Sequence, residues 1–114
     1  MGIQKVERDG KVAVLVSGGF GAGWSTWMDE EHAAVLLYHP KIVELVEQKR
    51  THEITQYLCK DILGILDKEN SYVCVLGASG LRVEWIEKGS LFEIEEYDGS
   101  ETLHIIGSRN YNIA

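Results

Sequence analysis

Apolar and polar positions follow different periods along the chain, and the changes of period divide it into strands, helices and strands again. An unbroken apolar run from Val12 to Val16 predicts a buried strand. A shorter strand over Ile3 to Val6 is expected before it, joined to it by a hairpin turn at Asp9-Gly10. The middle of the chain shows helical spacing, and the last third returns to the alternation typical of half-buried strands.

Three helices are expected in the middle of the chain. Asp29 suits the N-cap of the first helix, Pro40 the first turn of the second, and Thr51 the cap of the third. The apolar positions then give expected bounds of Glu30 to Tyr38, Pro40 to Arg50, and Thr51 to Leu66.

Four strands are expected after the helices, separated by glycine-containing turns. Their expected bounds are Tyr72 to Leu76, Leu81 to Trp85, Leu91 to Tyr97 and Thr102 to Ile106. The tail, residues 107–114, has no periodicity, and we expect it to be loosely held. Grouped helices between strand regions predict a single α+β domain over residues 1–114, with a mostly antiparallel sheet packed on one face by about three central helices.

Charge and composition exclude several classes of function. The net charge is −7 over 114 residues, which argues against direct DNA or RNA binding and against an anionic membrane surface. No apolar run approaches the roughly 20 residues of a membrane span, and the polar N-terminus does not look like a signal peptide, so a cytoplasmic protein is expected. Two isolated cysteines and four scattered histidines show no metal-ligand spacing, and no cofactor is expected.

A glycine-rich loop between the buried strand and the first helix is the main candidate site. Glycines permit close approach to the backbone, and N–H groups before a helix can receive a phosphate or carboxylate. Trp24 and Trp27 could form a wall on which a nucleobase stacks. The alternative is that both tryptophans seal the core while the glycines make a tight bend. The candidate ligand-binding residues are Ser17, Gly18, Gly19, Phe20, Gly21, Gly23, Trp24, Ser25, Thr26 and Trp27.

Known catalytic and nucleotide-binding motifs are absent from this loop. No lysine lies between Lys11 and Lys41, which excludes a Walker loop, and the residues Trp24 to Trp27 separate the glycines from the helix, unlike the dinucleotide fingerprint. A Gly-x-Ser-x-Gly motif is also missing, so a serine hydrolase is not expected.

Charged residues outside the loop supply weaker candidates. Arg82 and Arg109 are the expected partners of an anionic ligand, since arginine binds phosphate in a bidentate manner. The alternative for Arg82 is an exposed cross-strand pair with an acid. Glu96, Asp98 and Glu101 could form a general base or a divalent-metal site, although such a run is more often a solvated face with Asp98 capping its own turn.

Two stretches together resemble a family of small uncharacterised proteins encoded by phages, prophages and their hosts. The stretches are Gly19-Phe20-Gly21-Ala22-Gly23-Trp24-Ser25-Thr26-Trp27 and, near the C-terminus, Leu81 to Ile86 with Phe92 to Glu101. The resemblance covers about Val12 to Leu103 and brings no established activity with it. It implies a bacterial host cytoplasm and, by analogy with other small acidic phage proteins, a role in inhibiting host defence.

These observations lead to a non-enzymatic binding protein as the main hypothesis. We expect a homo-oligomer that sequesters a small anionic, nucleotide-derived ligand in the glycine loop. One alternative is a protein–protein inhibitor, similar to an anti-CRISPR protein or a nucleic-acid mimic, that presents an acidic surface to a host defence protein. A metal-dependent enzyme using the carboxylates near the C-terminus is a third hypothesis.

Overall fold

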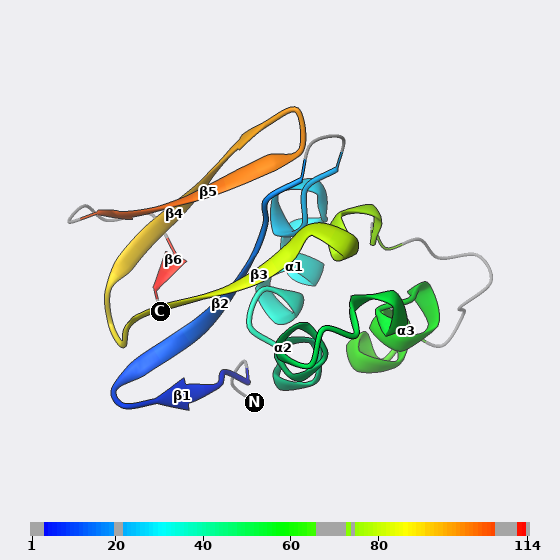
Figure 1. The fold of residues 1–114 in the computed structure, drawn as a ribbon, viewed down its shortest axis with the longest axis horizontal. Coiled ribbons are helices and arrows are strands. Elements are labelled where there is room, and N and C mark those ends of the chain that lie inside the picture. The colour runs from blue at the N-terminus through cyan, green and yellow to red at the C-terminus, as the bar shows by residue number, and fades with distance from the viewer. Residues whose placement is uncertain (1–3, 20–21, 66–72, 74, 107–111, 114) are drawn as a thin grey trace.

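The structure is a computed structural model that describes residues 4–19, 22–65, 73, 75–106 and 112–113, and its class is α+β (Figure 1). The antiparallel pairing expected from the sequence is confirmed, but the strands form two three-stranded sheets, in the orders β1-β2-β3 and β5-β4-β6. The strands are β1 (Glu7–Arg8), β2 (Lys11–Ser17), β3 (Leu81–Glu87), β4 (Leu91–Tyr97), β5 (Ser100–Ile106) and β6 (Asn112–Ile113). The helices are α1 (Glu30–Leu36), α2 (Pro40–Glu47) and α3 (Gln56–Leu63), with short 3₁₀ turns η1 (Ser25–Trp27), η2 (Thr51–Glu53) and η3 (Leu76–Gly80).

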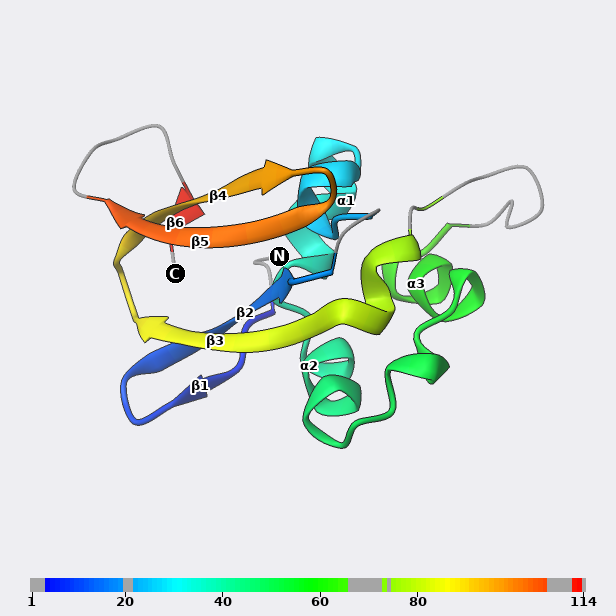
Figure 2. The same cartoon turned by 45° about the horizontal axis from the view of Figure 1, so that its top comes forward.

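Strand β2 lies between two apolar layers, which explains its unbroken apolar sequence. Ala13 and Leu15 face a core built mainly from the helices. Val12, Val14 and Val16 face the opposite way, toward a second core shared with β4 and β5. A strand covered on both faces has no solvent side on which polar residues could alternate. Figure 2 separates the two sheets, and the middle of β2 runs beneath the β4–β5 hairpin.

The helices begin and end for local reasons, and all three are shorter than expected. Helix α2 ends at Glu47 rather than Arg50, and α3 ends at Leu63, before the left-handed Gly64, whereas Leu66 lies outside the described residues. Helix α1 is shorter than expected, since Leu36 is its last residue. Thr51 begins the turn η2 rather than a helix, and Thr55 caps α3 instead, its side-chain oxygen accepting from the Leu58 N–H at 3.2 Å. None of the helices in the described part of the chain is long and apolar enough to cross a membrane.

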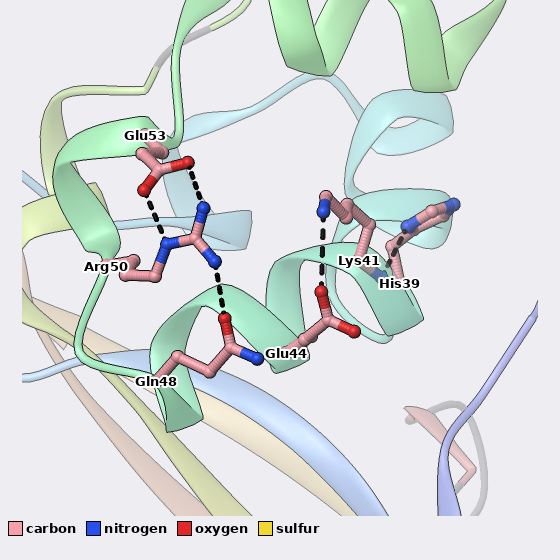
Figure 3. A network of polar contacts seen from close by, with 6 residues as sticks. All are labelled: His39, Lys41, Glu44, Gln48, Arg50 and Glu53. Atoms are coloured by element: carbon pink, nitrogen blue, oxygen red, sulfur yellow. Dashed lines mark hydrogen bonds and ion pairs between the residues drawn. The ribbon is translucent and has the colours of Figure 1, made fainter.

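Polar contacts secure both ends of α2 (Figure 3). At its start, His39 Nδ1 accepts from the Lys41 N–H at 3.1 Å, and Pro40 occupies the first turn as expected. After its end, the Arg50 guanidinium donates to both carboxylate oxygens of Glu53, at 2.5 and 2.6 Å, and to Gln48 Oε1 at 2.7 Å. These contacts fix the chain as it leaves α2.

Two strand predictions and the prediction for the tail differ from the structure, and β2, β3 and β5 are each two residues longer than expected. Residues 4–6 are irregular, and the first strand is Glu7–Arg8 instead. The strand expected over Tyr72 to Leu76 is wrong where the chain is described, because Val73 and Val75 are not in a strand and Leu76 begins η3; residues 72 and 74 lie outside the described residues. In the tail, Asn112–Ile113 pairs with β4, whereas residues 107–111 and 114 lie outside the described residues.

Two-residue turns set the register of both hairpins. Asp9 and Gly10 between β1 and β2, and Asp98 and Gly99 between β4 and β5, all have positive φ angles, between 49° and 89°. Such paired positive φ angles define the turn that matches the twist of two adjoining strands. The second turn places Tyr97 opposite Ser100 and Glu96 opposite Glu101.

Candidate functional site

Three connections far apart in the sequence meet beside the end of β2, a cluster we call the junction: the glycine loop (residues 17–27), η3 and the β4–β5 turn. The Gly18 N–H donates to Gly80 O at 3.0 Å, and Ser17 Oγ lies 3.2 Å from the carbonyl oxygens of both Ala22 and Gly77. Glycine is required where the backbones touch. A Cβ on Gly99 would overlap the backbone of Ala22, and one on Gly77 would overlap the carbonyl of Gly23.

The carboxylate of Glu101 occupies the centre of the junction. This side chain is buried, at 1% exposure. Its Oε1 accepts from the Ser17 N–H at 2.8 Å. Its Oε2 accepts from the Trp24 N–H at 2.8 Å, the Thr26 N–H at 3.1 Å and the Thr26 hydroxyl at 2.5 Å. Hydrogen bonds to an ionised acceptor are roughly twice as strong as neutral ones, so this single side chain ties the β4–β5 hairpin to the glycine loop.

The N–H groups that the loop was predicted to offer to an anionic ligand donate instead to an internal carboxylate. Three backbone N–H groups and one hydroxyl converge on the two oxygens of one carboxylate, as expected for a phosphate or carboxylate ligand. A small anionic ligand at this point would have to displace Glu101. From the sequence, Glu101 was only one of three metal candidates, and its structural role was missed. The signal was the Asp98-Gly99 turn, because a two-residue turn puts Glu101 on the same face as the apolar Leu103.

The two tryptophans of the loop have different environments, so they do not form a common stacking wall. Trp24 is fully buried, and its Nε1 donates to Leu36 O at 3.1 Å. This agrees with the alternative interpretation, in which tryptophan seals the core. Trp27 is 39% exposed, and its Nε1 donates to Glu96 Oε2 at 3.0 Å. Only Trp27 offers a surface to a partner.

The carboxylates proposed as metal ligands are engaged within the hairpin and loop. Glu96 accepts from the Gly99 N–H at 2.7 Å as well as from Trp27, and these two hydrogen bonds, that from Gly99 foremost, hold the pKa of Glu96 below its usual value. Asp98 occupies the first position of the turn, with φ 49°. Within the described part of the chain, no three His, Cys, Asp or Glu side chains are grouped as a metal site would require.

The predicted cationic partners of a ligand are placed only in part. Arg82 donates from Nε to Glu84 at 3.0 Å and from Nη2 to the Glu101 carbonyl oxygen at 3.4 Å, while Nη2 lies 2.8 Å from Glu84. This pairing with an acid resembles the alternative expected for Arg82, although Glu84 belongs to the same strand. Arg109, Phe20 and Gly21 lie outside the described residues.

Two surface hollows adjoin the junction. The smaller, of about 320 Å³, is lined by loop and η3 residues without a charged side chain among them: Ser17, Gly19, Ala22, Leu76, Gly77, Ser79 and Gly80. The larger, of about 390 Å³, lies between α1 and β4, and we call it the α1–β4 groove. Its lining residues are Ser25, Thr26, Met28, Glu30, Ala33, Ala34, Leu37 and Ile94.

Comparisons with known proteins do not add to this geometry: no protein-family model matches the chain, and no curated protein or solved structure gives a significant match. The resemblance to a phage-encoded family stays a prediction.

Proposed function

We propose that this chain is a non-enzymatic binding protein that holds an extended, basic segment of a partner protein in the α1–β4 groove. The observation that carries the proposal is the composition of the groove. Met28, Leu37 and Ile94 supply apolar surface, while Ala33 and Ala34 leave room beside α1. A hollow of about 390 Å³ is within the range of sites that hold a few side chains of a ligand.

The edge of β4 supports an extended conformation for the bound segment. In this hairpin, Tyr97 faces Ser100 across the two-residue turn, so the backbone groups of Glu93, Glu95 and Tyr97 point toward β5. Those of Ile94 and Glu96 point the opposite way. Strand β6 pairs with this edge only at Leu91–Phe92 among the residues described. A peptide strand added at Ile94 and Glu96 would form main-chain hydrogen bonds, and alternate side chains would enter the groove.

Charge favours a basic segment over an acidic one. Glu30 lines the groove, and the neighbouring Asp29 and Glu31 are exposed. The whole chain carries a net charge of −7, which also attracts a basic segment. Complementary charge speeds encounter and suppresses partners of the wrong sign.

The proposal develops the protein–protein alternative rather than the small-ligand hypothesis. A nucleotide-derived anion in the glycine loop stays a prediction, and it carries the added cost of displacing Glu101 from four hydrogen-bond donors. A host defence protein is one partner class that would present a basic segment, and that setting rests on the family resemblance alone.

The test is an NMR titration of ¹⁵N-labelled protein with two blocked hexapeptides, one alternating lysine with valine and the other glutamate with valine. The lysine peptide is expected to shift the amide signals of Ala33, Ala34, Ile94 and Glu96 in a saturable manner. These shifts should weaken when NaCl is raised from about 50 mM to about 500 mM, because salt screens the charges. The glutamate peptide should leave the signals in place.

A pair of variants locates the binding. Ala33→Leu fills the groove and should abolish the shifts, since leucine keeps a high helix propensity and leaves α1 intact. Glu44→Leu places the same side chain on the exposed face of α2 and should leave binding unchanged. Equal binding of both peptides, or shifts confined to β5, would contradict the proposal.

A further inference from the structure

Strand β5 presents its outer edge to solvent. It is the end strand of its sheet, and the alternation set by the two-residue turn points the backbone groups of Glu101, Leu103 and Ile105 away from β4. The Glu101 carbonyl is covered, because Arg82 Nη2 lies 3.4 Å from it. Among the residues described, no hydrogen bond engages the N–H or C=O groups of Leu103 and Ile105 on this edge.

The sequence of β5 lacks the features with which proteins protect such an edge. Exposed edges usually carry lysine, proline, a bulge or inward-pointing charge, each of which prevents pairing with another strand. Strand β5 contains no lysine, arginine or proline. Its one inward-pointing charge, Glu101, lies at the start of the strand that Arg82 covers, so the open part of the edge at Leu103 and Ile105 has none of these features. Ile105 is 62% exposed beside this edge. By contrast, β3, which is one of the two end strands of the other sheet, carries Arg82, Glu84 and Glu87.

We propose that β5 pairs with β5 of a second copy of this chain, joining the two β4–β5–β6 sheets into one continuous antiparallel sheet. The two-fold axis passes between the two copies of His104. Leu103 of each copy then faces Ile105 of the other, and each of these two pairs exchanges two hydrogen bonds. The two His104 residues form the intervening pair, whose backbone groups already bond to β4.

The covered start of the strand selects this register. An axis at Leu103 would require the backbone of Glu101 to pair with Ile105 of the second copy, but Arg82 occupies the Glu101 carbonyl. Moving the axis to His104 uses only the open part of the edge.

A second copy fits this edge better than a charged partner does. The open part of β5 carries no permanent charge. The two-fold arrangement lays the exposed Ile105 against Leu103 of the other copy, an apolar cross-strand pair on the face that already packs on the core. On the opposite face, Glu95 Oε1 lies 3.2 Å from His104 Nε2 within each copy.

Sedimentation or light scattering at about 100 µM protein tests the dimer. The wild-type chain is expected at twice its 12.8 kDa mass. Ile105→Lys puts a charge at the pairing edge and should raise the dissociation constant by about tenfold or more. Leu76→Lys is the matched control, since Leu76 is 65% exposed but lies in η3; it should remain dimeric. A monomeric wild type, or a dimer that Ile105→Lys does not weaken, overturns the proposal.

Cysteine cross-linking tests the register independently. Side chains of a pair whose backbone groups are not bonded to each other lie about 4.5–5.5 Å apart at Cβ, close to the distance that a disulfide spans. Mild oxidation of His104→Cys should therefore give a covalent dimer on non-reducing gels. Thr102→Cys faces Ile106 of the second copy and should not cross-link, nor should the wild type with its two native cysteines. Cross-linking of Thr102→Cys but not His104→Cys overturns the register.

Discussion

Strands β2 and β5 are both seven residues long and both reach the junction, yet their backbone edges differ. Strand β1 covers only part of one edge of β2, and each N–H group beyond it on that edge has a partner of its own. The Ala13 N–H donates to Val6 O and the Leu15 N–H to Leu37 O, both at 3.0 Å. The Ser17 N–H donates to the Glu101 carboxylate at 2.8 Å. Along the outer edge of β5, Arg82 covers one end, and the remainder faces solvent. The two edges differ because β2 is buried and β5 lies at the surface.

The comparison shows how a buried strand completes its hydrogen bonding without a full neighbouring strand. An N–H group buried without an acceptor costs free energy. Val6, Leu37 and Glu101 therefore supply the acceptors that a neighbouring strand would otherwise provide. Strand β5 lies at the surface, where water can satisfy the same groups. The edge of β2 formed by Ala13, Leu15 and Ser17, which we call the closed edge, therefore stabilises the fold. The outer edge of β5, which we call the open edge, is free for association.

Removing the carboxylate from the closed edge should have the largest effect. Glu101→Ala leaves the N–H groups of Ser17, Trp24 and Thr26 without their acceptor, which should lower the free energy of unfolding by about 3 kcal/mol or more. Urea denaturation measures this loss. Glu95→Ala, on the exposed outer face of β4, is the control and should change stability by about 0.5 kcal/mol or less.

Glu101→Gln sharpens the same experiment. Glutamine keeps an acceptor oxygen in place of one carboxylate oxygen, but its NH₂ group would face the donors that bind the other oxygen. The stability of the Glu101→Gln variant should therefore lie between those of wild type and Glu101→Ala. If Glu101→Ala costs no more than Glu95→Ala, the closed edge of β2 does not depend on this carboxylate.

The close backbone approach at the junction predicts a smaller effect, and the chain provides a matched pair of glycines. Gly99 and Gly89 both have φ +89°, but only Gly99 lies against another backbone, that of Ala22. Gly89→Ala should cost about 1 kcal/mol for the left-handed conformation alone. Gly99→Ala adds a steric clash and should cost about 2–3 kcal/mol. Equal costs in urea denaturation would contradict the close approach.

The contact between Glu96 and Trp27 predicts the smallest effect, visible in acid. The pKa of Glu96 is lowered on folding, so its stabilising contribution is present above the unfolded pKa and is lost as pH falls through the folded pKa, below the usual 4.5. Trp27 fluorescence followed from about pH 6 to about pH 3 should show a step with its midpoint below 4.5. Glu96→Gln should remove the step, and Trp27→Phe gives the background of the other tryptophans. A midpoint above 4.5 would contradict the hydrogen-bonded geometry.

The sequence predicted elements whose causes are local, and missed those set by distant contacts. Pro40 at the start of α2 and the Asp9-Gly10 and Asp98-Gly99 turns were predictable because each depends on a residue's own backbone preferences. The apolar run of β2 was likewise recognisable as a buried strand. Val73 and Val75 have strand-forming side chains, but the chain there turns into η3 to reach the junction, and no local pattern records that.

The junction likewise has one part that local sequence could predict and one part that depends on distant contacts. The convergence of N–H groups within residues 17–27 could be expected from the glycines and hydroxyls there, whereas ligand binding at this loop stays a prediction. The group that receives these hydrogen bonds could not be expected, because Ser17 and Glu101 are 84 positions apart and their contact depends on the stacking of two sheets. The tryptophans are similar in sequence context, yet Trp24 belongs to the buried core that the helices build, whereas Trp27 is 39% exposed.

The distance between Ser17 and Glu101 also has a consequence for synthesis of the chain. Ribosomes add about 5–20 residues per second, so about 4–17 s separate these two positions of the chain. For most of that interval β2 lacks β3 (Leu81–Glu87), and throughout it β2 lacks the carboxylate that completes its edge, although its apolar residues are already made. Such long-range pairing is intrinsically slow to form. We therefore expect the newly made N-terminal half to be the stage at which this protein depends most on chaperones.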